Sequence, residues 1–290
     1  QPSYHWKIQK HLLDSNLKIS VIFTTYNSPV WLEKVLWGWA RQSDDFHEIV
    51  IADDGSGPET RSVIERFRSE YPITVKHVWQ EDNGFQKCRI LNKAILAADG
   101  DYLVVSDGDC IPRSDFIAQH RKHAEPGYYL SGGYFKLPMT TSQLICKGDI
   151  ISQQCFDKKW LIENGVKPSL KFMKLTAGPV RSRLFNTLTT TKPTWNGHNA
   201  SCFRSDAIRV NGFDERMRYG GEDVEFGYRL RNAGIKAKQI RYSAVCIHLD
   251  HERGYVNQGD LELNRSILDE TVKEKHVMTP AGISQHAYDD

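Results

Sequence analysis

The chain has 290 residues, a length typical of one large domain or two small ones. It is 40% hydrophobic and 26% charged, which excludes a disordered tail, a collagen-like repeat and a disulfide-stapled miniprotein. Lysine and arginine number 38 against 36 aspartates and glutamates, so the formal charge of +2 makes no electrostatic case for nucleic acid as a partner. Its apolar runs fall far short of the roughly 20 residues that span a bilayer.

The six cysteines contain no C-x-x-C pair, which argues against a zinc ribbon or a thioredoxin-like site. Scattered single cysteines predict reduced core residues and a cytoplasmic location. The first residue is Gln1 rather than methionine, which leaves open whether an upstream segment has been removed.

The amino-terminal half alternates short apolar runs with helix-like segments. The predicted strands are Lys18–Thr24, Glu48–Asp54, Thr74–Trp79 and Tyr102–Ser106, and the predicted helices begin at Pro29, Pro58 and Cys88. This alternation is typical of β-α-β units in a doubly wound sheet, where ligands lie beyond the carboxyl ends of the strands.

The alternation stops between Cys146 and Lys192. This stretch contains nine Lys or Arg and three Asp or Glu, and predicts an insertion or flexible lobe. Regular patterns then resume as strands at Ala200–Arg204, Ala237–Tyr242 and Ala244–His248 and as helices at Glu222–Asn232 and Leu261–Lys275.

Two acidic motifs could carry chemistry. Asp107 and Asp109 directly follow a buried strand, where two carboxylates can hold one hard cation and through it a diphosphate; an Asp-Gly turn is the alternative. Glu222 and Asp223 follow a glycine pair at the start of a helix. Either could act there as a general base, or both could simply complement the helix dipole.

Histidine and aromatic side chains offer further candidates. His248 ends an apolar strand, with His251 three residues on, and could bind a metal or be structural. Tyr26 and Trp195 could stack on a base or a sugar ring, although most aromatic residues belong to the core.

In order and joint spacing these segments resemble the inverting family 2 glycosyltransferases of GT-A fold. The matching stations are Val21–Asn27, Ile51–Ser56, Asn83–Ala94, Val104–Asp109 and Tyr219–Leu230. The stretch from Trp195 to His251 also resembles a carboxyl-terminal galactosyltransferase-type module.

The resemblance implies a single Rossmann-like doubly wound mixed sheet with flanking helices. Residues 1–143 would form the nucleotide-sugar-binding half, 144–192 a variable basic lobe facing the acceptor, and 193–290 the half with the acceptor site, the catalytic base and a terminal helix.

The same resemblance assigns roles to individual residues. The donor-binding set is Thr24, Tyr26, Asn27 and Asp54 around the uracil, Asp53 as an orienting carboxylate, Asn83, Arg89 near the diphosphate, Asp107 and Gly108 at the ribose, and Trp195 as a platform. Asp109 and His248 would hold Mn²⁺ or Mg²⁺. Asp223 matches the catalytic base, and Glu222 would hydrogen-bond a sugar.

The activity implied is metal-dependent, inverting transfer of one hexose or N-acetylhexosamine from a UDP-sugar. The acceptor would be a bacterial surface glycan or glycolipid, such as a polysaccharide, lipopolysaccharide or capsule. The chain has no Q-x-x-R-W block after its catalytic acid, which favours a single transfer over processive synthesis. A sugar nucleotidyltransferase and a non-catalytic nucleotide-sugar-binding module are the alternatives.

The basic stretch Lys147–Lys192 and the helix Leu261–Lys275 would suit peripheral attachment to the inner face of the cytoplasmic membrane. A solvated basic face is the alternative, and nucleic acid is not an expected partner.

Overall fold

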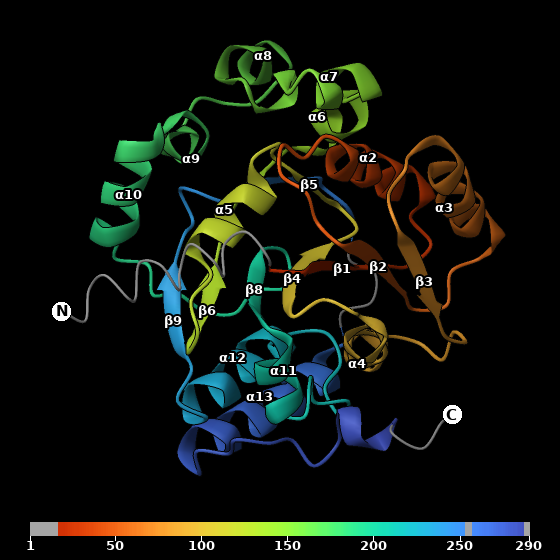
Figure 1. The fold of residues 1–290 in the computed structure, drawn as a ribbon, viewed down its shortest axis with the longest axis vertical. Coiled ribbons are helices and arrows are strands. Elements are labelled where there is room, and N and C mark those ends of the chain that lie inside the picture. Colours follow the sequence, from red (N-terminus) through yellow and green to blue (C-terminus); the bar gives the residue numbers. More distant parts are fainter. Residues whose placement is uncertain (1–16, 253–256, 287–290) are drawn as a thin grey trace.

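A seven-stranded mixed sheet lies at the centre of the molecule, in the computed structural model that describes residues 17–252 and 257–286 (Figure 1). The strands run in the order β3-β2-β1-β4-β8-β6-β9. Their bounds are β1 Ile19–Thr25, β2 Glu48–Asp53, β3 Val75–Trp79, β4 Tyr102–Asp107, β6 Tyr128–Ser131, β8 Ala200–Phe203 and β9 Lys236–Gln239. Strands β3, β2, β1 and β4 are parallel, whereas β8 is antiparallel to both β4 and β6, so the doubly wound mixed sheet is confirmed.

Helices cover both faces of this sheet (Figure 1). One face packs α2 (Pro29–Ala40) and α3 (Pro58–Glu70), each with a proline in its first turn, where the missing N–H costs nothing. The other packs α4 (Lys87–Ala97), α11 (Arg204–Arg209) and α12 (Glu222–Asn232), and α13 (Gln258–Lys273) packs on α12. Alternate residues of the central strand serve the two cores, because side chains along a strand point to opposite faces: Val21 and Phe23 to one, Ile22 to the other.

A small second sheet brings a distant segment to the end of β4. Its order is β5 (Cys110–Pro112), β10 (Val245–His248) and β7 (Gly133–Lys136). Strand β10 is antiparallel to β5, with His248 opposite Cys110, and parallel to β7. This register places His248 beside Asp109, although 139 positions separate them in sequence (248 minus 109).

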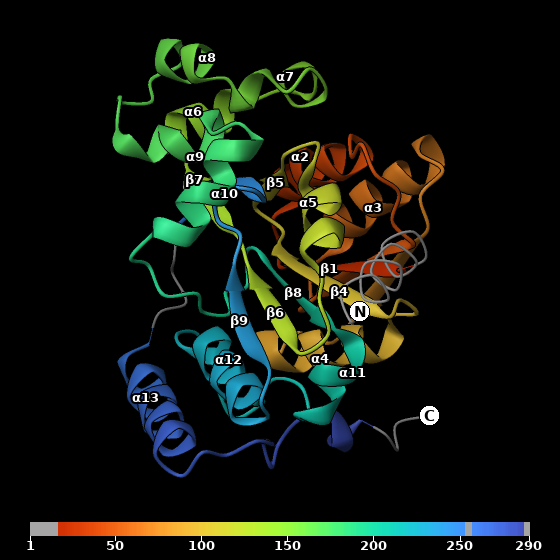
Figure 2. The same ribbon diagram turned by 60° about the vertical axis from the view of Figure 1, so that its left-hand side comes forward.

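The basic stretch is built from short helices rather than irregular chain. Helix α6 (Met139–Leu144) leads into it, and its elements are α7 (Lys147–Ile151), η1 (Gln154–Phe156), α8 (Lys158–Glu163), η2 (Leu170–Phe172), α9 (Met173–Thr176) and α10 (Pro179–Leu188). Figure 2 shows this lobe at the opposite end of the molecule from α12 and α13. Its short helices carry weak periodicity, which explains why the sequence pattern predicted no elements there.

The remaining helices are α5 (Phe116–His123) and the turn η3 (Ile283–Gln285). A search of the described helices finds none that combines the length and the apolar character of a membrane span. The six cysteines are free, and all except Cys146 are buried, as the sequence predicts for core thiols.

Candidate active site

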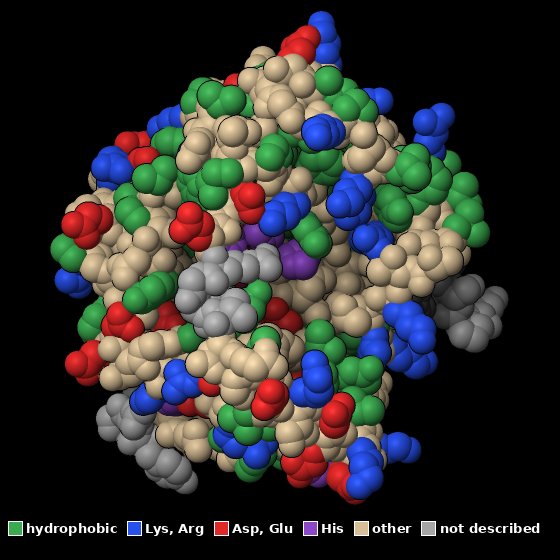
Figure 3. Space-filling model, turned by 180° about the vertical axis from the view of Figure 1, so that it is seen from behind, with side chains coloured by type: hydrophobic (Ala, Val, Ile, Leu, Met, Phe, Trp, Pro, Cys, Tyr) green, Lys and Arg blue, Asp and Glu red, His purple; other side chains and the backbone are tan. Residues whose placement is uncertain are grey.

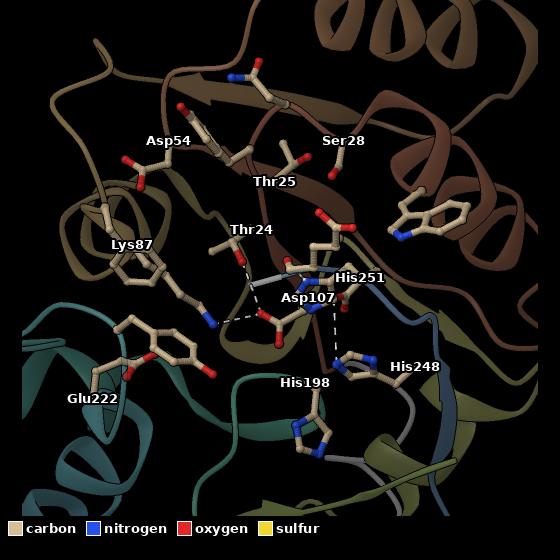
Figure 4. Close-up of a pocket in the computed structure, with 18 of the residues that line it drawn as sticks. Thr24, Thr25, Ser28, Asp54, Lys87, Asp107, His198, Glu222, His248 and His251 are labelled. Carbon is tan, nitrogen blue, oxygen red and sulfur yellow. Dashed lines mark hydrogen bonds and ion pairs between the residues drawn. The ribbon is translucent and has the colours of Figure 1, made fainter. Parts of the chain in front are cut away.

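A pocket of about 690 Å³ opens where β1, β2 and β4 end, the edge at which doubly wound sheets bind ligands (Figure 4). The predicted site residues that line it are Thr24, Tyr26, Asn27, Asp54, Asp107, Gly108, Asp109, Glu222, Asp223 and His248. The parallel strands β1 and β4 bring the segments Val21–Asn27 and Val104–Asp109 together, with Thr24 paired directly to Asp107. In the view from behind, histidine side chains are visible in a hollow of the surface (Figure 3).

Asp107 is held in the middle of the pocket. Its Oδ1 accepts hydrogen bonds from Thr24 Oγ1 at 3.2 Å and from the Lys87 ammonium at 2.9 Å. Burial raises the pKa of Asp107, but the charge and hydrogen bond of Lys87, together with His198 and His248, outweigh burial and lower it to about 2. The residue after Asp107 must be glycine, because a Cβ on Gly108 would lie 2.4 Å from the Thr24 carbonyl oxygen. This oxygen accepts the Gly108 N–H at 2.8 Å. The Asp-Gly-Asp turn is therefore fitted tightly against β1.

Asp109 faces two imidazoles. Its Oδ2 lies 3.8 Å from His248 Nε2 and 3.0 Å from His251 Nε2. In both rings Nδ1 contacts a backbone carbonyl, that of Leu249 at 2.7 Å and that of Glu252 at 2.9 Å. A carbonyl oxygen can only accept, so each Nδ1 carries the proton and each Nε2 presents its lone pair in the neutral ring.

This donor set fits a divalent cation. Each imidazole presents Nε2 to the same Asp109 oxygen, and two ligands about 2.1 Å from one octahedral cation lie about 3 Å apart, which matches the separation of Asp109 Oδ2 and His251 Nε2. Nδ1–H bonds to carbonyls are the usual means by which a protein orients ligating histidines. Asp109, Cys110 and His248 also group as potential metal-binding residues, with ligand atoms within 4.8 Å of one another. The sequence pattern noted His251 only as the neighbour of His248, and its approach to Asp109 is visible only in the fold.

The second wall of the pocket is the start of α12. Gly220 and Gly221 both have left-handed backbone angles (φ +107° and +95°), which turn the chain into the helix. Glu222 closes this turn, because its Oε2 accepts the Gly220 N–H at 2.8 Å. The predicted helix Glu222–Asn232 is confirmed.

Asp223 carries an unused acceptor. Its Oδ2 accepts the Gly197 N–H at 2.9 Å, whereas its buried Oδ1 has no hydrogen-bond partner within the described structure. Burial and the charges of Glu222 and Asp107 raise the pKa of Asp223 to about 7, although Lys87 opposes the shift. A carboxylate with a pKa near neutrality and a free oxygen has the properties of a general base.

Lys87 is a pocket residue that the sequence pattern missed. It lines the pocket and donates to Asp107, and the carboxylates of Asp107, Asp223 and Glu222 raise its pKa well above the usual range against the effect of burial. Arg89, predicted near the diphosphate, is not among the lining residues. Arg89 lies two residues after Lys87 on α4, and two residues turn an α-helix by about 200°. The two side chains therefore point to different sides of the helix.

Of the two aspartates of the predicted uracil site, one lines the pocket and the other supports its wall. Asp54 lines the pocket, accepts from Gln80 Nε2 and the Gln86 N–H, and has its pKa raised by burial. Asp53 lies behind it, 2.8 Å from both His77 Nε2 and the Ser56 N–H. It therefore holds the turn rather than facing a ligand.

Two further candidates lie outside the pocket lining. Trp195 is 1% exposed and packs edge-on against Phe226 in the core, so its interpretation as a sugar platform is corrected to a core residue. Asn83 is exposed in the loop before α4, next to the lining residues Gly84 and Phe85. The lining also includes His198, whose pKa burial lowers to about 4, so its imidazole is neutral.

Known proteins share both the sequence pattern and the fold. Residues 20–140 match the family model described as glycosyl transferase family 2, and residues 188–252 match the one described as the N-terminal domain of galactosyltransferase. An uncharacterized glycosyltransferase of Bacillus subtilis, YfnE, is 26% identical over 86% of this chain and 69% of its own length. Chondroitin synthase of Pasteurella multocida is also 26% identical, over 91% of this chain but only 28% of that protein.

Solved structures agree on the architecture. A mannosyltransferase from Pyrobaculum calidifontis in complex with GDP-Man and Mn²⁺ superposes with a TM-score of 0.56, at 20% identity, over 87% of this chain and 65% of that chain. S. aureus TarS 1–349 in complex with UDP-GlcNAc gives 0.58, at 19% identity, over 89% and 67%. The sheet, the pocket and these likenesses place the chain among the glycosyltransferases of GT-A fold. Its amino-terminal half belongs to glycosyltransferase family 2, as the sequence motifs predict.

Proposed function

We propose that this protein is a metal-dependent, inverting glycosyltransferase that moves one hexose or N-acetylhexosamine from a UDP-sugar to a hydroxyl of a bacterial surface glycan. The observation that carries the proposal is the division of one pocket into two chemically distinct walls. Figure 4 shows Lys87 and Glu222 on one side of Asp107 and the paired histidines on the other. A cation site and a base site thus flank the same space.

The donor would lie along the ends of β1 and β2. Tyr26 lines the pocket with its hydroxyl fixed by Asp82 Oδ2 at 2.8 Å, so its ring is oriented for a base. Asp54, buried beside it, supplies a carboxylate that can accept the uracil N3–H. Thr24 and Asn27 complete this wall, and Asp107 is placed for the ribose. The TarS structure with UDP-GlcNAc supports the choice of uridine, whereas the mannosyltransferase binds GDP-Man.

Asp109, His248 and His251 would hold Mn²⁺ or Mg²⁺. When bound, such a cation supplies Lewis-acid stabilisation of the departing diphosphate, an effect of several kcal/mol. Lys87, in place of Arg89, would supply the protein's own positive charge to offset the negative charge of the diphosphate. Its ammonium has further donors beyond the one that it gives to Asp107.

Asp223 would remove the proton of the acceptor hydroxyl through its unpartnered Oδ1. The oxygen then attacks the anomeric carbon on the face opposite the nucleotide, the bond to the diphosphate breaks, and the configuration inverts because only one displacement occurs. Positioned general bases of this kind contribute about 10²- to 10⁴-fold. Glu222, which fixes the turn before α12, would keep the base in place and contact a sugar hydroxyl.

The test is product analysis with a panel of UDP-hexoses and UDP-N-acetylhexosamines in Mn²⁺. Release of UDP with a product whose anomeric configuration is inverted, observed by NMR, supports the proposal. Release of pyrophosphate would identify a sugar nucleotidyltransferase, and tight UDP binding without transfer or hydrolysis would identify a binding module.

The acceptor would be a polysaccharide, lipopolysaccharide or capsule glycan at the cytoplasmic side of the membrane. The lobe supports a peripheral contact with an anionic bilayer. Along α10, Val180, Leu184 and Leu188 recur at every fourth position and are 83%, 52% and 66% exposed. The surrounding excess of Lys and Arg, nine against three acids, complements anionic headgroups.

A further inference from the structure

Three cations of different elements lie close together beside the pocket. Lys174 on α9 donates from Nζ to the Tyr134 carbonyl at 2.8 Å and lies 5.1 Å from the centre of the Tyr134 ring. Arg241, whose backbone contacts Gly133, and Lys171 in η2 just before α9 are close enough for their charges to act on Lys174. We refer to Lys171, Lys174 and Arg241 as the cation cluster.

Tyr134 connects the cation cluster to the pocket. It is 38% exposed on β7, and its ring contacts that of His198 at 4.4 Å and that of His248 at 5.8 Å between centroids. Both histidines line the pocket. Figure 3 shows Lys and Arg side chains gathered next to the histidines on this face.

The cation cluster has no compensating carboxylate. In the part of the chain that the structure describes, no ion pair joins any of the three cations to an acid. Arg241 Nε is buried and lacks a hydrogen-bond partner among those residues. Burial above all, with smaller contributions from the charges of Arg241 and Lys171, lowers the pKa of Lys174 to about 8. Like charges held together in this way are typical of a site for an anion.

We infer that the cation cluster binds an anionic group of the acceptor, a carboxylate, phosphate or sulfate, so that the acceptor is an acidic glycan. The inference rests on the proposed function and narrows its substrate class. Lys87 and Asp107, where the diphosphate would lie, line the pocket, whereas the three cations of the cluster are not among its lining residues and reach it through Tyr134, which contacts His198 and His248. The acceptor is therefore the substrate whose charge can reach the cluster.

The experiment measures binding of acidic oligosaccharides to the full chain saturated with UDP and Mn²⁺. Three probes are used, one with uronic acids, one phosphorylated and one sulfated, each with its neutral counterpart. We expect at least one acidic probe to bind about tenfold or more tightly than its neutral partner, as charge-assisted hydrogen bonds predict. Lys174→Gln and Arg241→Gln should remove this preference and leave UDP affinity unchanged.

Lys167→Gln is the matched control, because it removes one exposed cation from the same lobe outside the cluster. Lys171 is exposed, so Lys171→Gln replaces the other two cluster variants in the binding measurement if they do not fold. No preference for any acidic probe, or a preference that survives in all three cluster variants, contradicts the inference. An equal effect of Lys167→Gln also contradicts the inference. So does a cluster variant that loses affinity for UDP or for UDP-glucuronate instead of for the acidic probe. Failure of the parent chain to bind UDP is a different result, which contradicts the proposed function.

Discussion

The Lys87 ammonium lies 2.9 Å from the Asp107 carboxylate, and both residues line the pocket. Asp223 and Glu222 also act on the charge of Lys87. One lysine thus offsets the charge of acids in two motifs, the Asp-Gly-Asp turn and the start of α12. Asp109 and Asp223, one from each motif, are 114 positions apart in sequence.

Lys87→Met should weaken both donor binding and folding. The substitution removes a positive charge from the diphosphate region and leaves Asp107 with an unpaired, largely buried carboxylate, a loss of about 1–3 kcal/mol in the free energy of unfolding. Titration with UDP and urea denaturation measure the two effects. Arg89→Met is the control from the same helix and should leave UDP affinity unchanged; a larger effect there would return the diphosphate role to Arg89.

Asp223→Asn should lower the turnover rate by about 10²- to 10⁴-fold while UDP still binds. In the parent enzyme kcat/KM should rise as pH increases through about 7, because Asp223 has its pKa raised to about 7 and must be ionised to accept a proton. A pH-rate profile that is flat from about pH 6 to 8, or a variant that retains most of its rate, would show that another group is the base.

The raised pKa of Asp223 also makes the stability of the fold depend on pH. A carboxyl whose pKa is raised on folding favours the folded state while protonated, and this contribution is lost as pH rises from the unfolded value near 4 through about 7. Asp223→Asn should therefore be at least as stable as the parent above neutral pH. Thermal unfolding at two pH values checks the sign, and a marked destabilisation at the higher pH would contradict it.

His251→Ala should reduce Mn²⁺ affinity at least as much as His248→Ala, because His251 Nε2 is the nearer of the two to Asp109. Loss of a ligand should cost tenfold or more, given that loss of even an orienting group costs about 10- to 100-fold. Titration of Mn²⁺ followed by electron paramagnetic resonance gives the affinities. His276→Ala, an exposed histidine outside the pocket lining, should have no effect; unchanged affinity in both ligand variants would remove the histidines from the metal site.

Trp195→Ala should destabilise the fold by about 3–5 kcal/mol, the usual cost of deleting a large core aromatic. The side chain is buried against Tyr129 and Phe226, and a Cβ on Gly227 would lie 2.8 Å from Trp195 Cβ, so the packing there is close. Urea denaturation measures the change. A stable variant with impaired sugar binding would restore the platform interpretation.

Replacing Val180, Leu184 and Leu188 by serine should abolish binding to vesicles of phosphatidylglycerol and phosphatidylethanolamine. The exposed stripe on α10 provides the apolar contact, and the lobe's cations provide the attraction, so neutral phosphatidylcholine vesicles should bind the parent weakly. Serine at Leu263, Val272 and Met278 removes three other exposed apolar side chains and is the matched control. Cosedimentation that is equal in both triple variants would argue for a solvated face.

The sequence predicts those parts of the fold that depend on local pattern. Strands β1, β2 and β4 each contain a short apolar run, and α12 is bounded by Gly221 and Gly234, both with positive φ. The three residues of β5 could not be predicted, because they form a strand only by pairing with β10, more than a hundred residues later. The same non-local pairing brings His248 to Asp109.

The site residues that the sequence misassigned differ from the others in orientation rather than in type. Lys87 and Arg89 are both cations of one motif, and only the phase of α4, which begins at Lys87, decides which of them faces the pocket. Trp195 is an aromatic residue near the catalytic motif, and its burial depends on Phe226 and Tyr129 from other elements. Residue types predict the chemistry, and the packing of distant elements decides which side chains can perform it.

The most direct test of the account is calorimetric titration of UDP with and without Mn²⁺, on the parent chain and on Asp109→Ala, with GDP and CMP as controls. We predict binding of UDP that requires Mn²⁺, is lost in Asp109→Ala and is not matched by the other two nucleotides. No binding of UDP, or binding indifferent to Mn²⁺ and to Asp109, would reduce the Asp-Gly-Asp segment to a structural turn and contradict the proposed metal-dependent transfer.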